Sequence, residues 1–298
     1  MNAMRRNLLI HSLAVGSLSA FGENAPAQEK SKKPSAPLRL VSIGGALTEI
    51  IYLLDSSKEL VGVDTTSLYP DSATKLPNVG YARSLSSEGI LALKPTQVIA
   101  IEDAGPPIVL KHITNAGIPL AILHSNLRFE GVLDRVRKIG DLIDKPQVAN
   151  ELIQKLNLEW VKTQQNLTVA QLKKMSVLFI LSQNPTQLMV SGTNTSADAM
   201  IAYAGAKNAI TGFSGYKPLT PEALITANPD IILMTDQGIK ALGGVDGVLH
   251  FPGINKTTAG KQKNFICLEA MYMLGFGPRM PLAVRELNKL LAQTRSFS

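Results

Sequence analysis

The sequence contains little cysteine, histidine or aromatic residue, and these shortages exclude several kinds of protein. Cys267 is the one cysteine in 298 residues, so a disulfide within the chain is impossible. Aromatic residues make up 5% of the chain and histidine occurs four times, at positions far apart in sequence. A structural zinc site needs several convergent ligands, and no such cluster is present. Beyond the amino terminus no stretch is apolar for long enough to span a bilayer.

The charge is basic but spread along the chain. Lys and Arg number 30 against 23 Asp and Glu, which gives a formal charge of +7 and a pI near 9.4. There is no long Lys/Arg run and no aromatic interleaving, so we expect no nucleic-acid partner. Apolar residues at 45% are sufficient for a full core, and the length allows about two domains.

The amino terminus has the pattern of an export signal. Two arginines (Arg5 and Arg6) precede an apolar stretch over 8–21, and Ala25-Pro26-Ala27 is a small-x-small site. We predict a signal peptide over 1–27 and a Lys/Pro/Ser linker over 28–37. The arginine pair leaves the twin-arginine route open beside general secretion. No cysteine stands directly after the signal, so we expect no lipid anchor on the new amino terminus and a location in the periplasm. We also expect a monomer.

Strand-like and helix-like segments alternate from residue 38 onward, which predicts an α/β fold with mostly parallel sheets. Strands are expected at 39–43, 96–101, 120–123, 176–181 and 231–234. Apolar residues at helical spacing over 145–174 predict one helix of about 25 residues, 35–40 Å long. We therefore expect two similar lobes, 38–145 and 175–298, joined rigidly by a helix over 146–174, with a ligand cleft between the lobes.

An internal repeat supports two similar lobes. The segment around Glu88, followed by Lys94-Pro95-Thr96, matches the segment around Glu222, followed by Asn228-Pro229-Asp230. The two glutamates are 134 residues apart, and so are the two prolines. A Gly-Tyr pair precedes each copy, at 80–81 and at 215–216. Several matches in register indicate duplication.

The sequence gives little support to an enzyme. Gly44-Gly45 after a strand is the best sign of a nucleotide site, but the full glycine fingerprint with its acidic partner is absent. There is also no Gly-x-Ser-x-Gly elbow and no phosphate-loop lysine. We predict that the protein is not an enzyme and keep a nucleotide-using enzyme as a remote alternative.

Several motifs resemble a known family. They include 41–50 (VSIGGALTEI), 60–64 (LVGVD), 76–81 (LPNVGY), 87–95 (SEGILALKP) and 215–219 (GYKPL). Over about residues 38–295 the chain resembles the helical-backbone class of periplasmic binding proteins, which serve ABC importers of haem, ferric siderophores and cobalamin. Gly80-Tyr81-x-Arg83, followed by Ser86-x-Glu88-Gly89, resembles the haem-binding branch.

The resemblance implies roles for particular residues. Tyr81 would ligate the haem iron and Arg83 would support its phenolate, because ferric iron is a hard cation that suits an anionic oxygen. Tyr216, Lys217 and Arg279 are candidate supports of the haem pocket, and the two cations would face the propionates. Glu88 and Glu222 would dock on arginines of the dimeric inner-membrane permease. An outer-membrane haem receptor is a further expected partner upstream.

Purely structural interpretations of the same residues remain open. Tyr81 alone fits an aromatic residue packed beside a glycine turn, and both glutamates suit the first turn of a helix. His124 ends a predicted strand and is more simply a polar strand end, and His112 and His250 fit surface positions. Ser191 to Asp198 fits an anion site or, more simply, a helix cap at Thr195 or Ser196.

The number of haems is also open. Some relatives hold two haems, the second on a histidine of the second lobe. The matching segment here, 182–189, has no histidine, so we expect one haem. Tyr216 is the alternative second ligand. The competing ligands are a ferric siderophore and cobalamin, which bring their own donor atoms and need no tyrosine on the metal.

Overall fold

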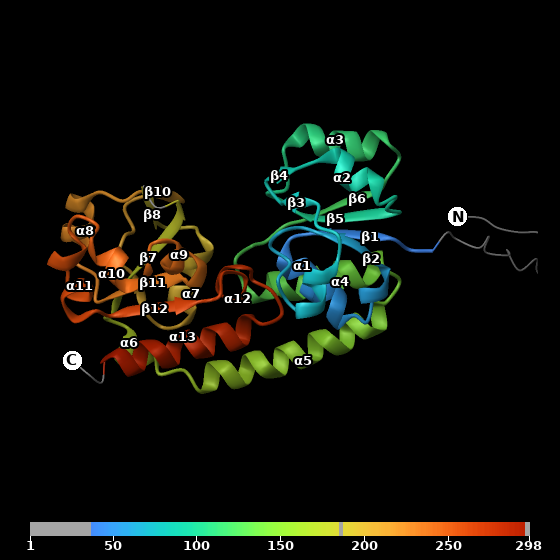
Figure 1. Ribbon diagram of the computed structural model, residues 1–298. Helices are drawn as coiled ribbons and strands as arrows, with labels where there is room; N and C mark the ends of the chain where they lie inside the picture. Colours follow the sequence, from blue (N-terminus) through green and yellow to red (C-terminus); the bar gives the residue numbers. More distant parts are fainter. Residues whose placement is uncertain (1–36, 185–186, 296–298) are drawn as a thin grey trace, which may run out of the picture. The chain divides into compact units, whose positions relative to one another are not determined.

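Two larger β-sheets flanked by helices, and one two-stranded hairpin, occur in the part of the chain that the computed structural model describes, residues 37–184 and 187–295 (Figure 1). The predicted signal peptide and nearly all of the predicted linker lie outside these residues. The first sheet has the order β2 (Leu60–Val63), β1 (Leu40–Ile43), β5 (Gln97–Ile101) and β6 (Leu120–Leu123), and every pair is parallel. The predicted α/β class is confirmed.

Helices cover both faces of the first sheet. α1 (Gly45–Leu53) and α4 (Phe129–Leu142) lie on one face, and α2 (Ser87–Ala92) and α3 (Pro107–Asn115) lie on the other (Figure 1). In α4, Phe129, Val132, Val136 and Ile139 recur at helical spacing and are each at most 2% exposed. This apolar stripe explains why the segment forms an amphipathic helix against the sheet.

The second sheet is mixed, with parallel strand pairs in the majority, as predicted. Its order is β10 (Tyr216–Pro218), β8 (Gln187–Ser191), β7 (Ser176–Asn184), β11 (Ile231–Thr235) and β12 (Phe265–Leu268), and β9 (Lys207–Asn208) also pairs with β7. β8 is antiparallel to β7 and β10, while the other pairs are parallel. The reason is the connection: only 185–186 separate β7 from β8, and a parallel crossover needs a dozen residues or more.

The helices of the second lobe also lie on two sides of their sheet. α7 (Ser196–Tyr203) and α12 (Ala270–Leu274) contribute to the large core that both lobes share. A separate core on the other side takes residues from α8 (Pro221–Ala227), α10 (Gly244–Leu249) and α11 (Thr258–Gln262), and α9 (Asp236–Ala241) packs there. Three short 3₁₀ turns complete the described elements: Ser57–Glu59, Asp71–Lys75 and Ile254–Lys256.

The connecting helix is shorter than predicted. α5 runs over Pro146–Gln165, which is 20 residues or about 30 Å, and a separate short helix α6 follows at Val169–Leu172. The expectation of one helix through residue 174 was wrong. The chain leaves the helix because the Thr168 amide donates to the Asn288 side chain at 3.1 Å instead of to the preceding turn. The Asn166 side chain donates to the Lys162 carbonyl at 2.7 Å and closes the helix end.

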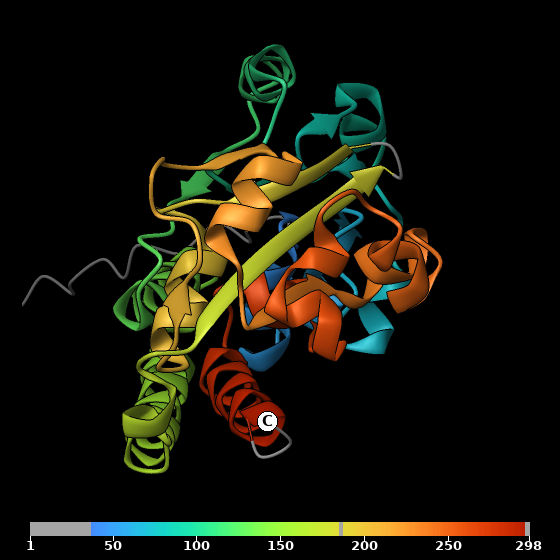
Figure 2. The ribbon, with the colours of Figure 1, turned by 90° about the vertical axis from the view of Figure 1, so that its left-hand side faces the viewer.

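A second long helix runs beside the connector. α13 (Met280–Arg295) packs along α5, and Thr163 donates to the Pro281 carbonyl at 3.2 Å (Figures 1 and 2). A group of aromatic residues joins helices of the two lobes. Trp160 of α5 stacks on Phe129 of α4 at 4.7 Å between ring centroids and meets Tyr203 of α7 edge-on at 5.3 Å. One shared core with stacked rings favours a rigid connection of the lobes.

Backbone conformation supports the internal repeat. The glycine before each repeated tyrosine has a positive φ, +99° at Gly80 and +82° at Gly215, where a side chain would be strained. Lys94 and Asn228, the residues before the repeated prolines, are both left-handed, with φ of 47° and 36°. These two positions are non-glycine residues in an uncommon conformation. Their agreement indicates the same local fold in both lobes.

Candidate functional site

Tyr81 and Arg83 lie on a short hairpin beyond the carboxyl ends of the first sheet. β3 (Gly80–Tyr81) pairs with β4 (Ser84–Leu85), and two loops hold the hairpin in place (Figure 1). The Gly105 amide donates to the Ala82 carbonyl at 2.9 Å, and the Thr65 amide donates to the Gly80 carbonyl at 3.0 Å. These loops follow β5 and β2. In parallel α/β sheets this edge is where ligands bind.

The two predicted residues are in direct contact. Nη1 of Arg83 donates a hydrogen bond of 2.6 Å to the Tyr81 hydroxyl, and the guanidinium carbon lies 5.8 Å from the centre of the tyrosine ring. Tyr81 is 38% exposed, so its oxygen is accessible to a ligand. The arrangement places a cation where it stabilises a phenolate. A hard metal ion that displaced the phenolic proton would gain an anionic oxygen ligand with a charged donor beside it.

A carboxylate that the sequence analysis missed completes this group. Asp103 accepts a hydrogen bond of 2.5 Å from Nη2 of Arg83. Burial lowers the pKa of the Arg83 guanidinium, but its hydrogen bonds to Asp103 and Tyr81 raise it, and the net pKa is raised. Asp103 follows β5 by two residues. That position, just after a strand of a parallel sheet, was a signal that the sequence analysis did not use.

His124 lies at the end of β6 with a second missed carboxylate. Its Nδ1 is 3.3 Å from Glu102, which also accepts a hydrogen bond of 2.6 Å from the Ser125 amide. The imidazole is 76% exposed. The predicted polar strand end is therefore confirmed, and nothing in the described residues brings a second histidine to it: no group of three His, Cys, Asp or Glu capable of holding a metal occurs there.

Tyr216 lies on β10 of the second lobe and is directed largely into that lobe. Its ring meets Phe179 edge-on at 6.5 Å between centroids. Burial raises the pKa of the Tyr216 phenol, while a hydrogen bond from Thr195 and the charge of Arg83 oppose the rise.

Lys217 is the exposed neighbour of Tyr216. Its ammonium group lies 4.8 Å from the centre of the Phe213 ring, an arrangement that holds the side chain by a cation–π contact. It has no carboxylate partner among the described ion pairs, in contrast to Arg279. Its charge is therefore available to an anion that enters the space beside β10.

Arg279 is already paired. It donates two hydrogen bonds to Glu49 of α1, at 2.6 and 2.9 Å, and a longer one of 3.3 Å to Glu269. Its guanidinium also lies over the rings of Tyr69 and Tyr272, at 4.0 and 5.1 Å. With two carboxylate partners, Arg279 has little charge left for a propionate. The structure assigns it instead to the contact between α1 and the segment before α13.

The segment after β8 forms a helix cap. Thr195 accepts a hydrogen bond of 3.0 Å from the Asp198 amide at the start of α7 and lies 2.6 Å from the Ser191 hydroxyl. Thr195 is 5% exposed. The capping interpretation is confirmed. Because Thr195 also contacts Tyr216, the cap helps to fix the tyrosine in the second lobe.

The two repeated glutamates occupy equivalent exposed positions. Glu88 lies in the first turn of α2 and Glu222 in the first turn of α8, and both side chains are exposed. Neither forms a salt bridge within the described part of the chain. Two accessible carboxylates at matching positions of two similar lobes suit a partner with two equivalent basic sites.

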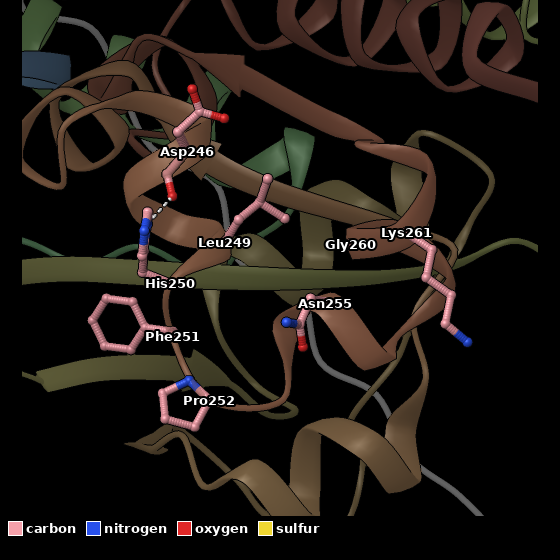
Figure 3. Close-up of a pocket in the computed structure, with 8 residues that line it drawn as sticks. All are labelled: Asp246, Leu249, His250, Phe251, Pro252, Asn255, Gly260 and Lys261. Atoms are coloured by element: carbon pink, nitrogen blue, oxygen red, sulfur yellow. Dashed lines mark hydrogen bonds between the residues drawn. The ribbon is translucent and has the colours of Figure 1, made fainter.

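A hollow of about 550 Å³ lies elsewhere in the second lobe (Figure 3). His250 lines it and its Nδ1 is 2.6 Å from the Asp246 carbonyl, with Phe251 and Lys261 nearby. None of the sequence-predicted site residues lines this hollow.

His112, on α3, is 3.3 Å from the Ser87 hydroxyl. His112 and His250 are both exposed, as expected of surface residues. In 37–184 and 187–295, no helix is long and apolar enough to cross a membrane.

Comparison with known proteins defines the family. Residues 40–272 match the family model described as periplasmic binding protein, so the chain belongs to that family. Two solved structures are similar: the periplasmic heme-binding protein BhuT in complex with two hemes, and the periplasmic heme-binding protein RhuT from Roseiflexus sp. RS-1 in apo form. For BhuT the identity is 40%, the TM-score 0.81, and the coverage 86% of this chain and 98% of that one. For RhuT the values are 38%, 0.83, 87% and 99%.

Relatives by sequence include different binding proteins. An uncharacterized ABC transporter substrate-binding lipoprotein, YvrC of Bacillus subtilis, is 28% identical and covers 84% of this chain and 79% of its own length. A vitamin B12-binding protein of Vibrio campbellii is 26% identical, with coverages of 76% and 77%. The chain is therefore a substrate-binding protein of an ABC-type transporter, with the two-lobed α/β fold predicted from the sequence.

Proposed function

We propose that this protein captures one ferric haem between its lobes and delivers it to an ABC-type inner-membrane importer. The single observation that carries the proposal is the contact between Tyr81 and Arg83. A phenolic oxygen, exposed on a rigid hairpin and hydrogen-bonded by a guanidinium at 2.6 Å, suits an iron with an open axial position. Both similar solved structures are heme-binding proteins, which supports the same ligand.

Tyr81 is proposed as the axial ligand of the haem iron. To bind iron as an anionic ligand, the Tyr81 oxygen must lose its proton. The metal provides most of the driving force, and the charge of Arg83 stabilises the anion that forms. The proton leaves from the Tyr81 oxygen to solvent, which is possible because the side chain is partly exposed. The pair thus selects a metal that lacks a strong ligand of its own.

Lys217 is proposed to meet a propionate of the haem. It is exposed, its stem is held on Phe213, and no carboxylate competes for it in the described residues. Arg279, which the sequence analysis also proposed, is less suited because Glu49 and Glu269 already neutralise it. Tyr216 is proposed to form part of the opposite wall, since its oxygen is engaged with Thr195. One iron ligand predicts one haem per chain.

The proposed location is the periplasm, after export by a cleaved signal over residues 1–27. Glu88 and Glu222 are proposed to dock on the two halves of the permease dimer, with an outer-membrane haem receptor acting upstream. The protein is proposed to act as a monomer and without catalysis. Mass spectrometry of the periplasmic form tests the export step: a mature amino terminus near Gln28 is expected, and an intact Met1 on cytoplasmic protein contradicts it.

Cobalamin is the second candidate ligand, because relatives by sequence include vitamin B12-binding proteins. The metal of cobalamin carries its own ligands, so it would leave the Tyr81–Arg83 pair without a role. Titration of the mature protein with hemin and, separately, with cyanocobalamin distinguishes the two, with changes in the visible absorption spectrum as the readout. We expect a saturable hemin spectrum with an end point of one per chain and no response to cyanocobalamin. The reverse result refutes the haem proposal.

A further inference from the structure

Arg83 bridges two oxygen acceptors on different segments of the chain. One amino group of its guanidinium, Nη1, donates to Tyr81 at 2.6 Å, and the other, Nη2, donates to Asp103 at 2.5 Å. The side chains of Arg83 and Asp103 are 54% and 55% exposed. Ion pairs this exposed contribute little to stability. The Arg83–Asp103 pair therefore matters through its effect on the third group in contact, the Tyr81 oxygen.

The backbone holds Asp103 and Tyr81 in a fixed relationship. Two hydrogen bonds of 2.9 Å join the loop after β5 to the hairpin, one from the Gly105 amide to Ala82 and one from the Leu85 amide to Gly105. The loop that carries Asp103 and the hairpin that carries Tyr81 are thus one rigid frame. The guanidinium sits at the end of a long side chain, and its two hydrogen bonds join it to the two oxygens of that frame.

A free arginine in this place would have other options. Its guanidinium carries five donors on a long flexible side chain, and a planar fork matches a carboxylate best. A haem brings two carboxylates as propionates. If Arg83 were not held, it could turn from the phenol to a propionate or to solvent. Asp103 already satisfies the carboxylate preference of Arg83 and does so in a geometry that leaves Nη1 directed at Tyr81.

We propose that Asp103 is a positioning residue that commits Arg83 to the Tyr81 oxygen and so sets the strength of the iron–phenolate bond. The expected effect on the iron–phenolate bond rests on the proposed haem ligation. The expected effect on the position of Arg83 concerns the ligand-free protein. Asp103 touches neither the iron nor the porphyrin in this account. Its effect passes entirely through Arg83, and this makes the proposal open to a test by coupled substitutions.

The structural step is tested without haem, by NMR of the arginine side chain. In the ligand-free protein with ¹⁵N-labelled arginine, the two acceptors should hinder rotation of the Arg83 guanidinium, and Arg83→Ala assigns its signal. We expect Asp103→Ala to speed this rotation markedly, and Asp103→Asn, which retains an acceptor oxygen, to give an intermediate rate. Asp134→Ala, which removes the equally exposed partner of Arg137 on α4, is the matched control and should leave the Arg83 signal unchanged. Equal rotation rates in wild type and Asp103→Ala overturn the proposal.

The functional step is tested by a double-mutant cycle with hemin. Asp103→Ala should weaken hemin affinity by about threefold to tenfold and shift the phenolate-to-iron charge-transfer band toward that of Arg83→Ala, while Asp103→Asn recovers most of both. In the Arg83→Ala background the same substitution should change affinity by less than about twofold, since the mediator is gone. An equal loss in both backgrounds shows that Asp103 acts independently of Arg83 and overturns the proposal. If wild type fails to bind hemin, the proposed function falls while the NMR result still decides the structural step.

Discussion

Arg279 and Glu49, which are 230 residues apart in the chain, form a two-pronged ion pair that joins α1 to the segment before α13. Glu49 is 4% exposed and Arg279 is 19% exposed, so both charges are largely removed from water. The rings of Tyr69 and Tyr272 lie over the guanidinium. Such a pair is costly to break, because the remaining charge stays buried without its partner.

The first prediction concerns this pair. Arg279→Ala leaves the Glu49 carboxylate buried and should lower the free energy of unfolding by about 3–5 kcal/mol at neutral pH. Urea denaturation followed by circular dichroism measures it. Arg137→Ala breaks an exposed pair with Asp134 and is the control, with an expected loss below about 1 kcal/mol. Equal losses in the two variants refute the structural role of Arg279.

The second prediction concerns pH. Burial raises the pKa of Glu49 above its ordinary value of 4.5, and the hydrogen bond and charge of Arg279 oppose the rise. The folded state therefore binds more protons than the unfolded state just above pH 4.5. The stability from this carboxyl is fully present below that pH and is lost as the pH rises through the folded pKa.

Glu49→Gln removes this dependence. The free energy of unfolding of the variant, minus that of wild type, should rise with pH across the same window. Urea denaturation at a series of pH values measures the difference. A difference that is constant, or that falls as the pH rises, contradicts the raised pKa.

The third prediction concerns delivery. Glu88→Ala with Glu222→Ala should leave hemin binding unchanged, because both side chains are exposed on helices outside the tyrosine site. Uptake of haem by cells that depend on this importer should fall, since both docking charges are gone. Binding is measured by hemin titration and uptake by growth on haem as the iron source. Normal growth of the double variant would mean that the glutamates only stabilise their helices.

Much of the fold could be predicted because the patterns are local. Strands such as 97–101 and 120–123 are short apolar runs, and the repeat fixed the equivalence of the lobes. The end of α5 could not be predicted, since it depends on the contact between Thr168 and Asn288, far away in sequence. The antiparallel course of β8 depends on the two-residue connection at 185–186, and the Asn184-Pro185 turn signal there was not used in the prediction.

The site was predicted in part. Tyr81 and Arg83 share one motif, so the sequence brought them together. Asp103 and Glu49 lie outside that motif, and their roles emerge only when the chain folds. Arg279 shows the opposite case: the family resemblance suggested a cation available to a propionate, whereas folding gives it two carboxylates. A single sequence does not reveal which charged side chains will pair when they are far apart in the chain.

The central claim is that Tyr81 ligates the iron of a captured haem. Tyr81→Phe removes one oxygen and keeps the ring, so it should leave the fold intact; Tyr52→Phe in α1 is the matched control. The visible absorption and electron paramagnetic resonance spectra of the ferric hemin complex provide the measurement. We expect five-coordinate, high-spin iron with a phenolate band in wild type and in the control. In Tyr81→Phe the band should be absent and the affinity about a hundredfold lower or more, a change of ~2.7 kcal/mol. A Tyr81→Phe complex with the wild-type spectrum and affinity, or the loss of that spectrum in Tyr216→Phe instead, contradicts the account.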